Sequence, residues 1–265
     1  MACGARAACA AALALAAIIP AVSADEARAG GLALIPAGLY TPFQRVKPAN
    51  ASAPQLTSTT IGAFSLDIEP VTNAEFLDFV IAHPEWRKSR IKTLFADSSY
   101  LKRWPSDLEL TDAEASGEPV TNVSWFAAEA YCRARGLRLP TTEQWEYALA
   151  DAGRDQDAVR KRSLEWFAEP NGARPGAIGG PANGYGVRDM VGLIWEWTLD
   201  YGAYATTAEL RDPNGSDGAA FCGGAAAGVA DATDYPAFMR YAMRASLKAS
   251  YTAGNLSFRC AGGAP

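Results

Sequence analysis

The first part of the chain alternates short apolar stretches with turn residues, a pattern typical of small strands. Leu32–Ile35 is predicted to be a strand, because its apolar residues run into a Pro-Ala-Gly turn. Phe64–Ile68 alternates at the strand period of two and ends before Pro70. We therefore expect two short strands in this part of the chain.

A helix is predicted to begin after Thr72. The sequence Thr72-Asn-Ala-Glu75 has the form of a capping box, in which the hydroxyl and the carboxylate each satisfy a free N–H of the first turn. Pro84 stops this helix, and His83 is interpreted as a C-terminal cap rather than a metal ligand. The predicted buried face is Phe76, Phe79 and Val80.

Two further helices are predicted later in the chain. Ser124 caps one that ends at Gly136, and the capping box Thr141–Gln144 begins another that ends at Gly153. Residues 88–118 are polar and without periodicity, so they are predicted to be a long connection. After Gly153 the chain is rich in glycine, proline and aromatic residues. The predicted class is therefore α+β with little regular secondary structure and a core held largely by aromatic residues.

Composition and charge exclude several functions. The chain has 265 residues, 49% of them hydrophobic, which is typical of a globular protein. Its 24 Lys and Arg against 29 Asp and Glu give a net charge of −5, so it lacks the basic surface of a nucleic-acid binder. His83 is the only histidine, which excludes zinc sites with several histidines and the two-histidine iron triad.

The first 24 residues are predicted to be a secretory signal peptide. Ala7–Val22 is apolar and mostly alanine, and Val22-Ser23-Ala24 offers small residues for cleavage. A mitochondrial presequence is the alternative, but a single arginine argues against it. We expect a periplasmic or secreted protein with one domain over residues 25–265. We also expect no membrane span after signal removal, because no later apolar stretch is long enough.

Export changes how the cysteines are interpreted. Loss of the signal removes Cys3 and Cys9 and leaves Cys132, Cys222 and Cys260. In an oxidising compartment two of these three are expected to pair and one to stay free. Their spacing alone does not say which two.

Several motifs, in order, resemble the formylglycine-generating enzyme (sulfatase-modifying factor) family. The matching blocks are Ile35–Gly38, Glu69–Asn73, Pro119–Trp125, Ala130–Cys132, Leu137–Tyr147, Asn183–Gly192, Trp195–Thr198, Gly223-Gly224 and Asn255–Ala261. The resemblance implies a single α+β domain with the C-type-lectin-related fold of that family. It also implies a disulfide between Cys132 and Cys260, which would leave Cys222 as the free thiol.

The resemblance further implies a reaction centre that this chain lacks. Active members of the family oxidise a sulfatase cysteine with oxygen and a copper(I) ion held between two thiolates. The corresponding stretch, residues 223–238, contains neither cysteine nor histidine, and Ala225 and Ala226 stand where serine and tryptophan are expected. Because copper(I) at low coordination number prefers two facing sulfurs, we expect family-type oxidation to be lost.

Other residues could supply different metal ligands. Cys222 with Met239 and Met243, which are four residues apart on a predicted helix, is a candidate copper set, although all three also fit a packed core. Glu196 is a candidate calcium ligand, because relatives often bind calcium around this motif. However, Leu193 occupies the position of an expected asparagine ligand.

The charged residues near these motifs have a structural interpretation. Glu196 is expected to pair with a buried arginine, for which Arg240, Arg244 and Arg259 are the candidates. Glu143 and Glu146 are interpreted as charges at a helix start rather than as catalytic acids.

Three functions remain open from the sequence. The first is an accessory or maturation factor for a periplasmic metalloenzyme, because Phe-Cys222-Gly-Gly resembles divergent family members encoded beside copper nitrite reductases of denitrification. The second is a copper- and oxygen-dependent cysteine oxidase that uses Cys222. The third is a lectin-like binding module that uses Tyr201, Tyr204 and Tyr235. We expect a monomer in each case.

Overall fold

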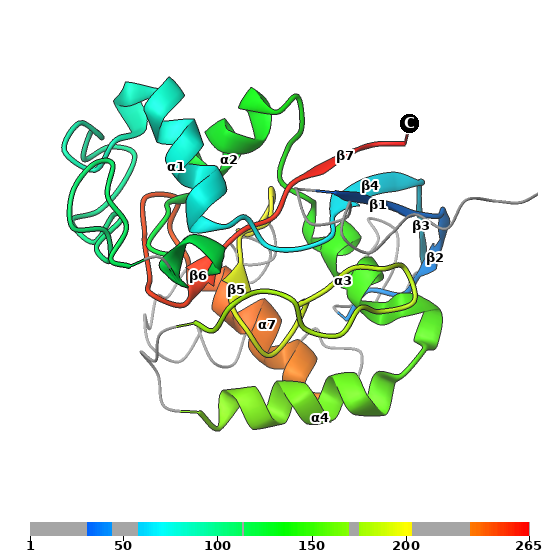
Figure 1. Cartoon of the computed structure of the whole chain (residues 1–265). Coiled ribbons are helices and arrows are strands. Elements are labelled where there is room, and N and C mark those ends of the chain that lie inside the picture. The colour runs from blue at the N-terminus through cyan, green and yellow to red at the C-terminus, as the bar shows by residue number, and fades with distance from the viewer. Residues whose placement is uncertain (1–30, 44–57, 113, 170–174, 203–233, 265) are drawn as a thin grey trace, which may run out of the picture.

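Two antiparallel sheets built from segments far apart in the sequence frame one side of the molecule (Figure 1). The computed structural model describes residues 31–43, 58–112, 114–169, 175–202 and 234–264. Strands β1 (Leu32–Ile35), β4 (Phe64–Asp67) and β7 (Ala261–Gly263) form a sheet in the order β1-β4-β7. Beside it, β2 (Gly38–Tyr40) pairs with β3 (Thr59–Ile61). The last strand of the chain, β7, thus belongs to the same sheet as the first strand, β1.

The register of β1 explains its sequence pattern. Leu32 pairs with Asp67 and Ile35 pairs with Phe64. Ala33 and Ile35 lie in the core, whereas Leu32 and Leu34 are exposed. A third, parallel pair is formed by β5 (Trp195–Glu196) and β6 (Leu256–Ser257), which lie deep in the molecule. The strands predicted at 32–35 and near 64–68 are therefore confirmed.

The helices begin where the capping signals place them. Helix α1 (Asn73–Ala82) has both hydrogen bonds of the Thr72–Glu75 capping box, and His83 is its C-cap. Helix α2 (Trp125–Ala134) is capped by the Ser124 hydroxyl. Helix α3 (Thr142–Ala150) has the second capping box. It ends before the predicted Gly153, because Asp151 adopts a left-handed backbone with φ of 46°.

Other parts of the described chain differ from the sequence-based expectation. Helix α4 (Gln156–Phe167) was not predicted, because its residues are mostly polar and present no clear apolar stripe. Residues 88–118 form few regular elements, as expected, but they place Tyr100, Leu101 and Trp104 in the core. Short 3-10 turns occupy Pro84–Trp86, Glu114–Gly117 and Asp151–Gly153, and α7 (Tyr235–Ala245) follows.

Aromatic side chains and a disulfide fill the larger core. Phe76 stacks on Tyr131 with ring centroids 5.8 Å apart, and Tyr131 meets Phe258 edge to face at 5.3 Å. Beside these rings Cys132 of α2 is bonded to Cys260, and both residues are fully buried. This is the cysteine pair that the family resemblance implies. The expected α+β class with an aromatic core is confirmed.

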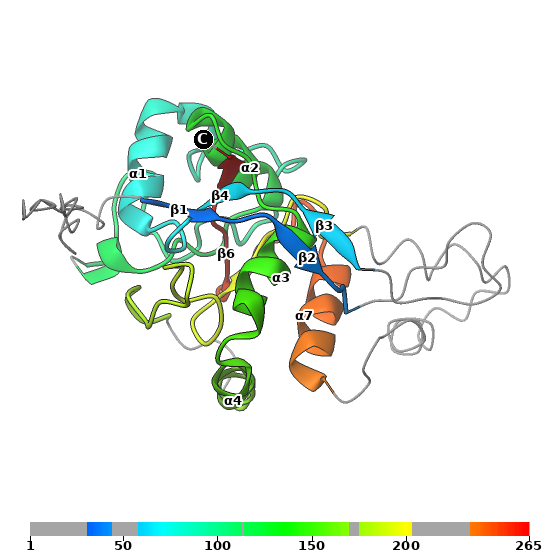
Figure 2. The same cartoon turned by 90° about the vertical axis from the view of Figure 1, so that its right-hand side faces the viewer.

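Three helices gather on the side away from the β1-β4-β7 sheet. Helices α3 and α7 run beside each other in Figure 2, and Figure 1 shows α4 running below both of them. Helix α7 also contacts α4, while α3 packs against β3. Among the described residues no helix is long and apolar enough to span a membrane.

Removing the disulfide is expected to destabilise the protein strongly. Its two cysteines are 128 residues apart, so Cys132→Ser with Cys260→Ser should lower the free energy of unfolding by about 4 to 5 kcal/mol through loop-closure entropy. Urea unfolding followed by tryptophan fluorescence measures the change. A loss below about 1 kcal/mol would show that the bond does not constrain the unfolded chain.

Candidate functional site

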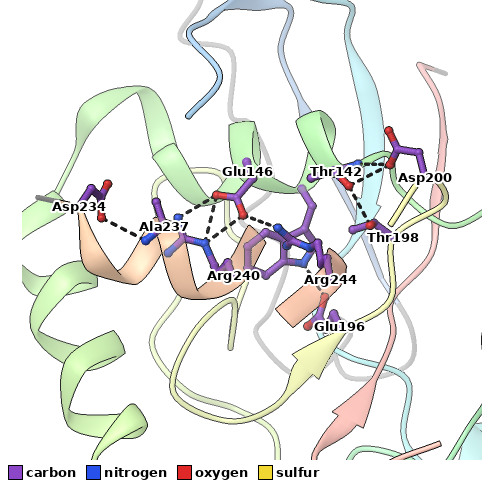
Figure 3. Close-up of polar contacts among 10 residues, drawn as sticks. Thr142, Glu146, Glu196, Thr198, Asp200, Asp234, Ala237, Arg240 and Arg244 are labelled. Carbon is purple, nitrogen blue, oxygen red and sulfur yellow. Dashed lines mark hydrogen bonds and ion pairs between the residues drawn. The ribbon is translucent and has the colours of Figure 1, made fainter. Parts of the chain in front are cut away.

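A single buried carboxylate holds two arginines at the junction of α3 and α7. Arg240 Nε and Nη2 donate to Glu146 at 2.9 Å (Oε1) and 2.8 Å (Oε2), and Arg244 Nη1 donates to Oε1 at 2.6 Å (Figure 3). The side chain of Glu146 is only 3% exposed. Such a charge is tolerated in the interior only when it is paired and fully hydrogen-bonded. Glu146 therefore fixes the position of α7 against α3.

The sequence of α7 explains this geometry. Arg240 and Arg244 are four residues apart, so they lie on one face of the helix. The helix begins with Asp234 as N-cap, whose Oδ1 accepts the Ala237 N–H at 3.1 Å, and Pro236 occupies its first turn. Both features define the helix start and thus the register of the two arginines.

A second buried ion pair lies next to the first. Arg259 Nη2 donates to Glu196 Oε1 at 2.7 Å, and Trp145 Nε1 donates to Oε2 at 2.7 Å. The guanidinium of Arg244 lies over the Trp145 ring, 4.6 Å from its centroid. Trp145 thus links the Glu146 pair to the Glu196 pair. The network connects α3, α7, β5 and the segment that leads into β7.

The environment of Glu146 determines its protonation state. Burial raises its pKa, but the attraction and hydrogen bonds of Arg240 and Arg244 outweigh burial, and the pKa lies below its ordinary value. The carboxylate is therefore ionised at neutral pH. Held by two guanidinium groups, it is poorly suited to act as a general base.

A cleft of about 480 Å³ opens beside this ion pair, between α4, α7 and the residues after β2. Glu146 and Arg240 reach its wall from the buried network. The remaining lining mixes apolar and charged side chains: Tyr40, Thr41, Pro42, Phe43, Leu149, Ala150, Gln156, Asp157, Val159, Arg160, Ser163, Asp234, Pro236 and Ala237. A cleft whose wall combines apolar side chains with a few fixed polar groups is typical of a recognition site.

The candidate copper ligands are only partly described. Cys222 and residues 223–233 lie outside the described residues. Met239 and Met243 both lie on α7 as predicted, each partly buried, and Met243 packs against the larger core. In the described ranges, no cluster of three or more His, Cys, Asp or Glu side chains could hold a metal ion.

The carboxylates near the candidate calcium motif take part in separate contacts. Both oxygens of Glu196 accept hydrogen bonds from Arg259 or Trp145. Asp189 accepts the N–H groups of residues 179 and 180, and Asp200 accepts the Thr142 N–H at 2.7 Å. A calcium ion at Glu196 would have to displace a bound guanidinium, so this carboxylate does not fit calcium in the present arrangement.

Two sequence-based interpretations of single residues need correction. Glu146, interpreted from the sequence as a charge at a helix start, is instead buried and paired with arginines of α7. Tyr201, a candidate contact residue of the lectin-like module, is partly buried and packs edge-on against Trp197 with ring centroids 5.1 Å apart. Tyr235 is exposed, and Tyr204 lies outside the described residues.

The expected buried arginine partner of Glu196 is one of the three candidates, Arg259. The other two candidates, Arg240 and Arg244, pair with Glu146 instead, which the sequence did not predict. The missed signal is local: Glu146 lies between Trp145 and Tyr147, among the buried residues of α3. A charged residue between two buried aromatic residues indicates a buried ion pair.

Comparison with known proteins reveals relatives over most of the chain. The profile of the sulfatase-modifying factor enzyme 1-like domain matches residues 20–264. A protein named inactive C-alpha-formylglycine-generating enzyme 2 from Bos taurus is 28% identical over 247 residues, covering 77% of this chain and 79% of that protein. The formylglycine-generating enzyme of Bos taurus is 28% identical over 290 residues, covering 86% of this chain and 73% of that protein.

Other similarities cover less of the two chains or concern the structure. Hercynine oxygenase of Mycolicibacterium smegmatis is 32% identical over 162 residues, which are 52% of this chain and 37% of that protein. The structure of PvdO from Pseudomonas aeruginosa superimposes with a TM-score of 0.47 at 16% identity, covering 88% of this chain and 94% of that one.

Neutralising Glu146 is expected to destabilise the fold. Glu146→Gln leaves two buried guanidinium groups without their counter-charge, which should lower the free energy of unfolding by about 3 to 5 kcal/mol. Glu143→Gln, on the same helix but less buried, should change it by no more than about 0.5 kcal/mol. Chemical denaturation of both variants measures the difference, and equal effects would contradict the assigned role.

The same ion pair predicts an acid-sensitive component of stability. The folded pKa of Glu146 lies below the ordinary value of 4.5, so its contribution is full above pH 4.5 and is lost as the pH falls through the folded pKa. Glu146→Gln should lack this component. Thermal unfolding between pH 3 and 6 should therefore show the melting temperature of the variant approaching that of the parent as the pH falls. A constant difference between the two melting temperatures would contradict this assignment.

Proposed function

We propose that the chain, which belongs to the sulfatase-modifying factor enzyme 1-like family, is an exported member without the copper reaction centre. In this proposal it serves as an accessory factor in the maturation or docking of an exported metalloenzyme. The observation that carries the proposal is the number of available thiols.

The number of free cysteines argues against a two-thiolate copper site. Residues 25–265 contain Cys132, Cys222 and Cys260, and the first and last of these are joined in a buried disulfide. Cys222 is then the one thiol left for metal binding. Copper(I) held between two thiolates of one chain needs a second, so the family chemistry has no site here.

The cleft supports a recognition role rather than proton transfer. Glu146 and Arg240 at its wall are locked in an ion pair, and Glu146 is ionised. Rigid charged groups on a partly apolar wall can orient a bound segment of another protein. Some relatives are named as inactive formylglycine-generating enzymes, which is consistent with family members that keep the fold without the oxidation.

Export is supported by the same disulfide. Such bonds persist in oxidising compartments and are rare in the bacterial cytosol. Residues 1–24, the proposed signal peptide, lie outside the described residues. The proposed location is thus the periplasm or the extracellular space, and the proposed partner is a copper reductase or another secreted enzyme.

The copper reductase is proposed from the residues around Cys222. The sequence Phe221-Cys222-Gly-Gly resembles family members encoded beside copper nitrite reductases. A single thiol is sufficient to pass copper to a partner, because transfer needs only transient binding of the ion. Oxidation by the family mechanism needs a copper ion that stays bound between two thiolates. In this proposal Met239 and Met243, which lie on α7, would supply thioether sulfur to the same ion.

The catalytic alternative is tested by turnover. The purified protein, loaded with copper(I) under oxygen, should convert no cysteine of a sulfatase-derived peptide to its aldehyde, as followed by mass spectrometry. An active formylglycine-generating enzyme serves as positive control. Aldehyde formation that is abolished by Cys222→Ser would replace the accessory role with a single-thiol oxidase.

The accessory role is tested by co-expression with an exported copper reductase of the same organism. Reductase purified from cells that contain the chain should hold more copper per subunit than reductase from cells without it. Arg160→Glu, in the cleft lining, should reduce this gain, whereas Lys161→Glu, adjacent on α4 and outside the lining, should not. Equal copper content in all four cultures would reject the role.

A further inference from the structure

Two clefts border helix α4. One is the cleft of about 480 Å³ between α4 and α7, and the other, of about 330 Å³, lies between α4 and residues 177–193. Leu149 and Val159 line both of them, so these two side chains form a wall between the clefts. Because Val159 belongs to α4, the separation of the two clefts depends on the position of this helix.

Helix α4 buries little of its own surface. Of its twelve described residues, six are exposed and Ser163 alone is buried. The Ser163 hydroxyl donates to the Val159 carbonyl, and Lys161 pairs with Glu165, so both of these interactions stay within the helix. Most helices are held in place by an apolar face that packs on the core. Since α4 has little of such a face, only a small free energy keeps it in its present position.

The turn before α4 has a strained backbone. Among the five described residues 151–155, Asp151, Ala152 and Asp155 have φ of 46°, 51° and 50°. This left-handed region is unfavourable for residues that carry a Cβ. Asp151 anchors the turn, because its carboxylate accepts the Arg154 guanidinium at 2.6 Å and the Gly184 N–H at 2.8 Å. Strained residues persist only where such contacts hold them.

Asp155 lies at the joint between this anchored turn and the helix. It is the N-cap of α4, but in the described part of the chain its side chain makes no capping hydrogen bond. Hinges are a few residues at the ends of elements that absorb a change of φ and ψ. A turn of Asp155 to an ordinary negative φ would also relieve its strain. Asp155 therefore suits a hinge.

An aromatic stack holds the opposite end of α4. Phe167 lies nearly parallel to the Trp195 ring with centroids 5.4 Å apart, and Trp166 meets the same ring at 4.6 Å. Trp195 belongs to β5, which pairs with β6 inside the molecule, so it is fixed independently of α4. All three rings are only partly buried. Contacts between a few rings are weak enough to break and form again, as a latch requires.

We propose that α4 is a hinged lid beside the recognition cleft, which turns about Asp155 and is latched by the aromatic stack on Trp195. Figure 2 shows α4 nearly end-on at the outer end of α3, where the helix can turn outward. In the open position Val159 moves away from Leu149, and the two clefts become one groove.

The open groove has one moving wall and one fixed wall. Helix α7 stays in place, because Arg240 is paired with the buried Glu146. The groove admits an extended segment of a partner protein that neither cleft holds alone, and closure of α4 presses this segment against α7. This use of the motion rests on the proposed accessory role, whereas the motion itself does not.

Thiol labelling tests the motion without any partner. Ser163 is fully buried at the cleft, so the thiol of Ser163→Cys reacts with iodoacetamide only when α4 opens. Ala148→Cys is the matched control, since Ala148 is equally buried but lies on α3. Mass spectrometry of the digested protein separates both thiols from Cys222. Ser163→Cys should be labelled at least about tenfold faster than Ala148→Cys.

Low concentrations of urea distinguish opening from global unfolding. Turning α4 exposes little surface, so labelling of Ser163→Cys should hardly depend on urea below the unfolding transition, whereas labelling of Ala148→Cys should rise steeply. Adding Phe167→Ala should speed labelling of Ser163→Cys about tenfold, because the latch on Trp195 is lost. Leu164→Ala, which removes an exposed side chain of the same helix outside the stack, should not.

Hydrogen exchange shows whether α4 turns as a helix or unfolds. Amides in the middle of α4 should be more strongly protected than the thiol of Ser163→Cys, because turning leaves the helical hydrogen bonds intact. Equal protection would overturn the proposal. Equal labelling of Ser163→Cys and Ala148→Cys, or equal effects of Phe167→Ala and Leu164→Ala, would also overturn it. These measurements need neither copper nor a partner, so their failure is distinct from failure of the accessory role.

Discussion

The disulfide between Cys132 and Cys260 is the bond on which both the fold and the proposed function depend. It ties α2 to the last strand segment across 128 residues and lies among the stacked rings of the larger core. The same bond consumes two of the three cysteines in residues 25–265. A single covalent link thus stabilises the fold and removes the sulfur that a two-thiolate copper site would need.

The ion pairs of Glu146 and Glu196 organise the other half of the molecule. They join α3, α7, β5 and the C-terminal segment through Trp145, which accepts the Arg244 guanidinium on its face and donates to Glu196. Buried charges of this kind add specificity of position more than net stability. They place α7 beside the cleft and keep its wall rigid, which suits binding better than proton transfer.

Much of this fold could be predicted from short-range signals, whereas the pairing of its charges could not. Capping boxes at Thr72 and Thr141 are local chemistry, so the helix starts were correct. Helix α4 was missed because its polar residues lack an apolar stripe. The partner of Glu146 is 94 residues away in Arg240, and only the packing of α3 on α7 brings them together. Likewise, the strand order β1-β4-β7 is set by contacts between distant segments, which the pattern of one strand does not contain.

Counting free thiols tests the central claim most directly. The oxidised protein, purified without reductant, is denatured, alkylated and digested, and its peptides are identified by mass spectrometry. Alkylation at Cys222 alone, together with a linked peptide that contains Cys132 and Cys260, is the expected result. Alkylation of Cys222 and a second of these cysteines in the same molecules would restore a pair of thiolates and contradict the loss of the copper centre.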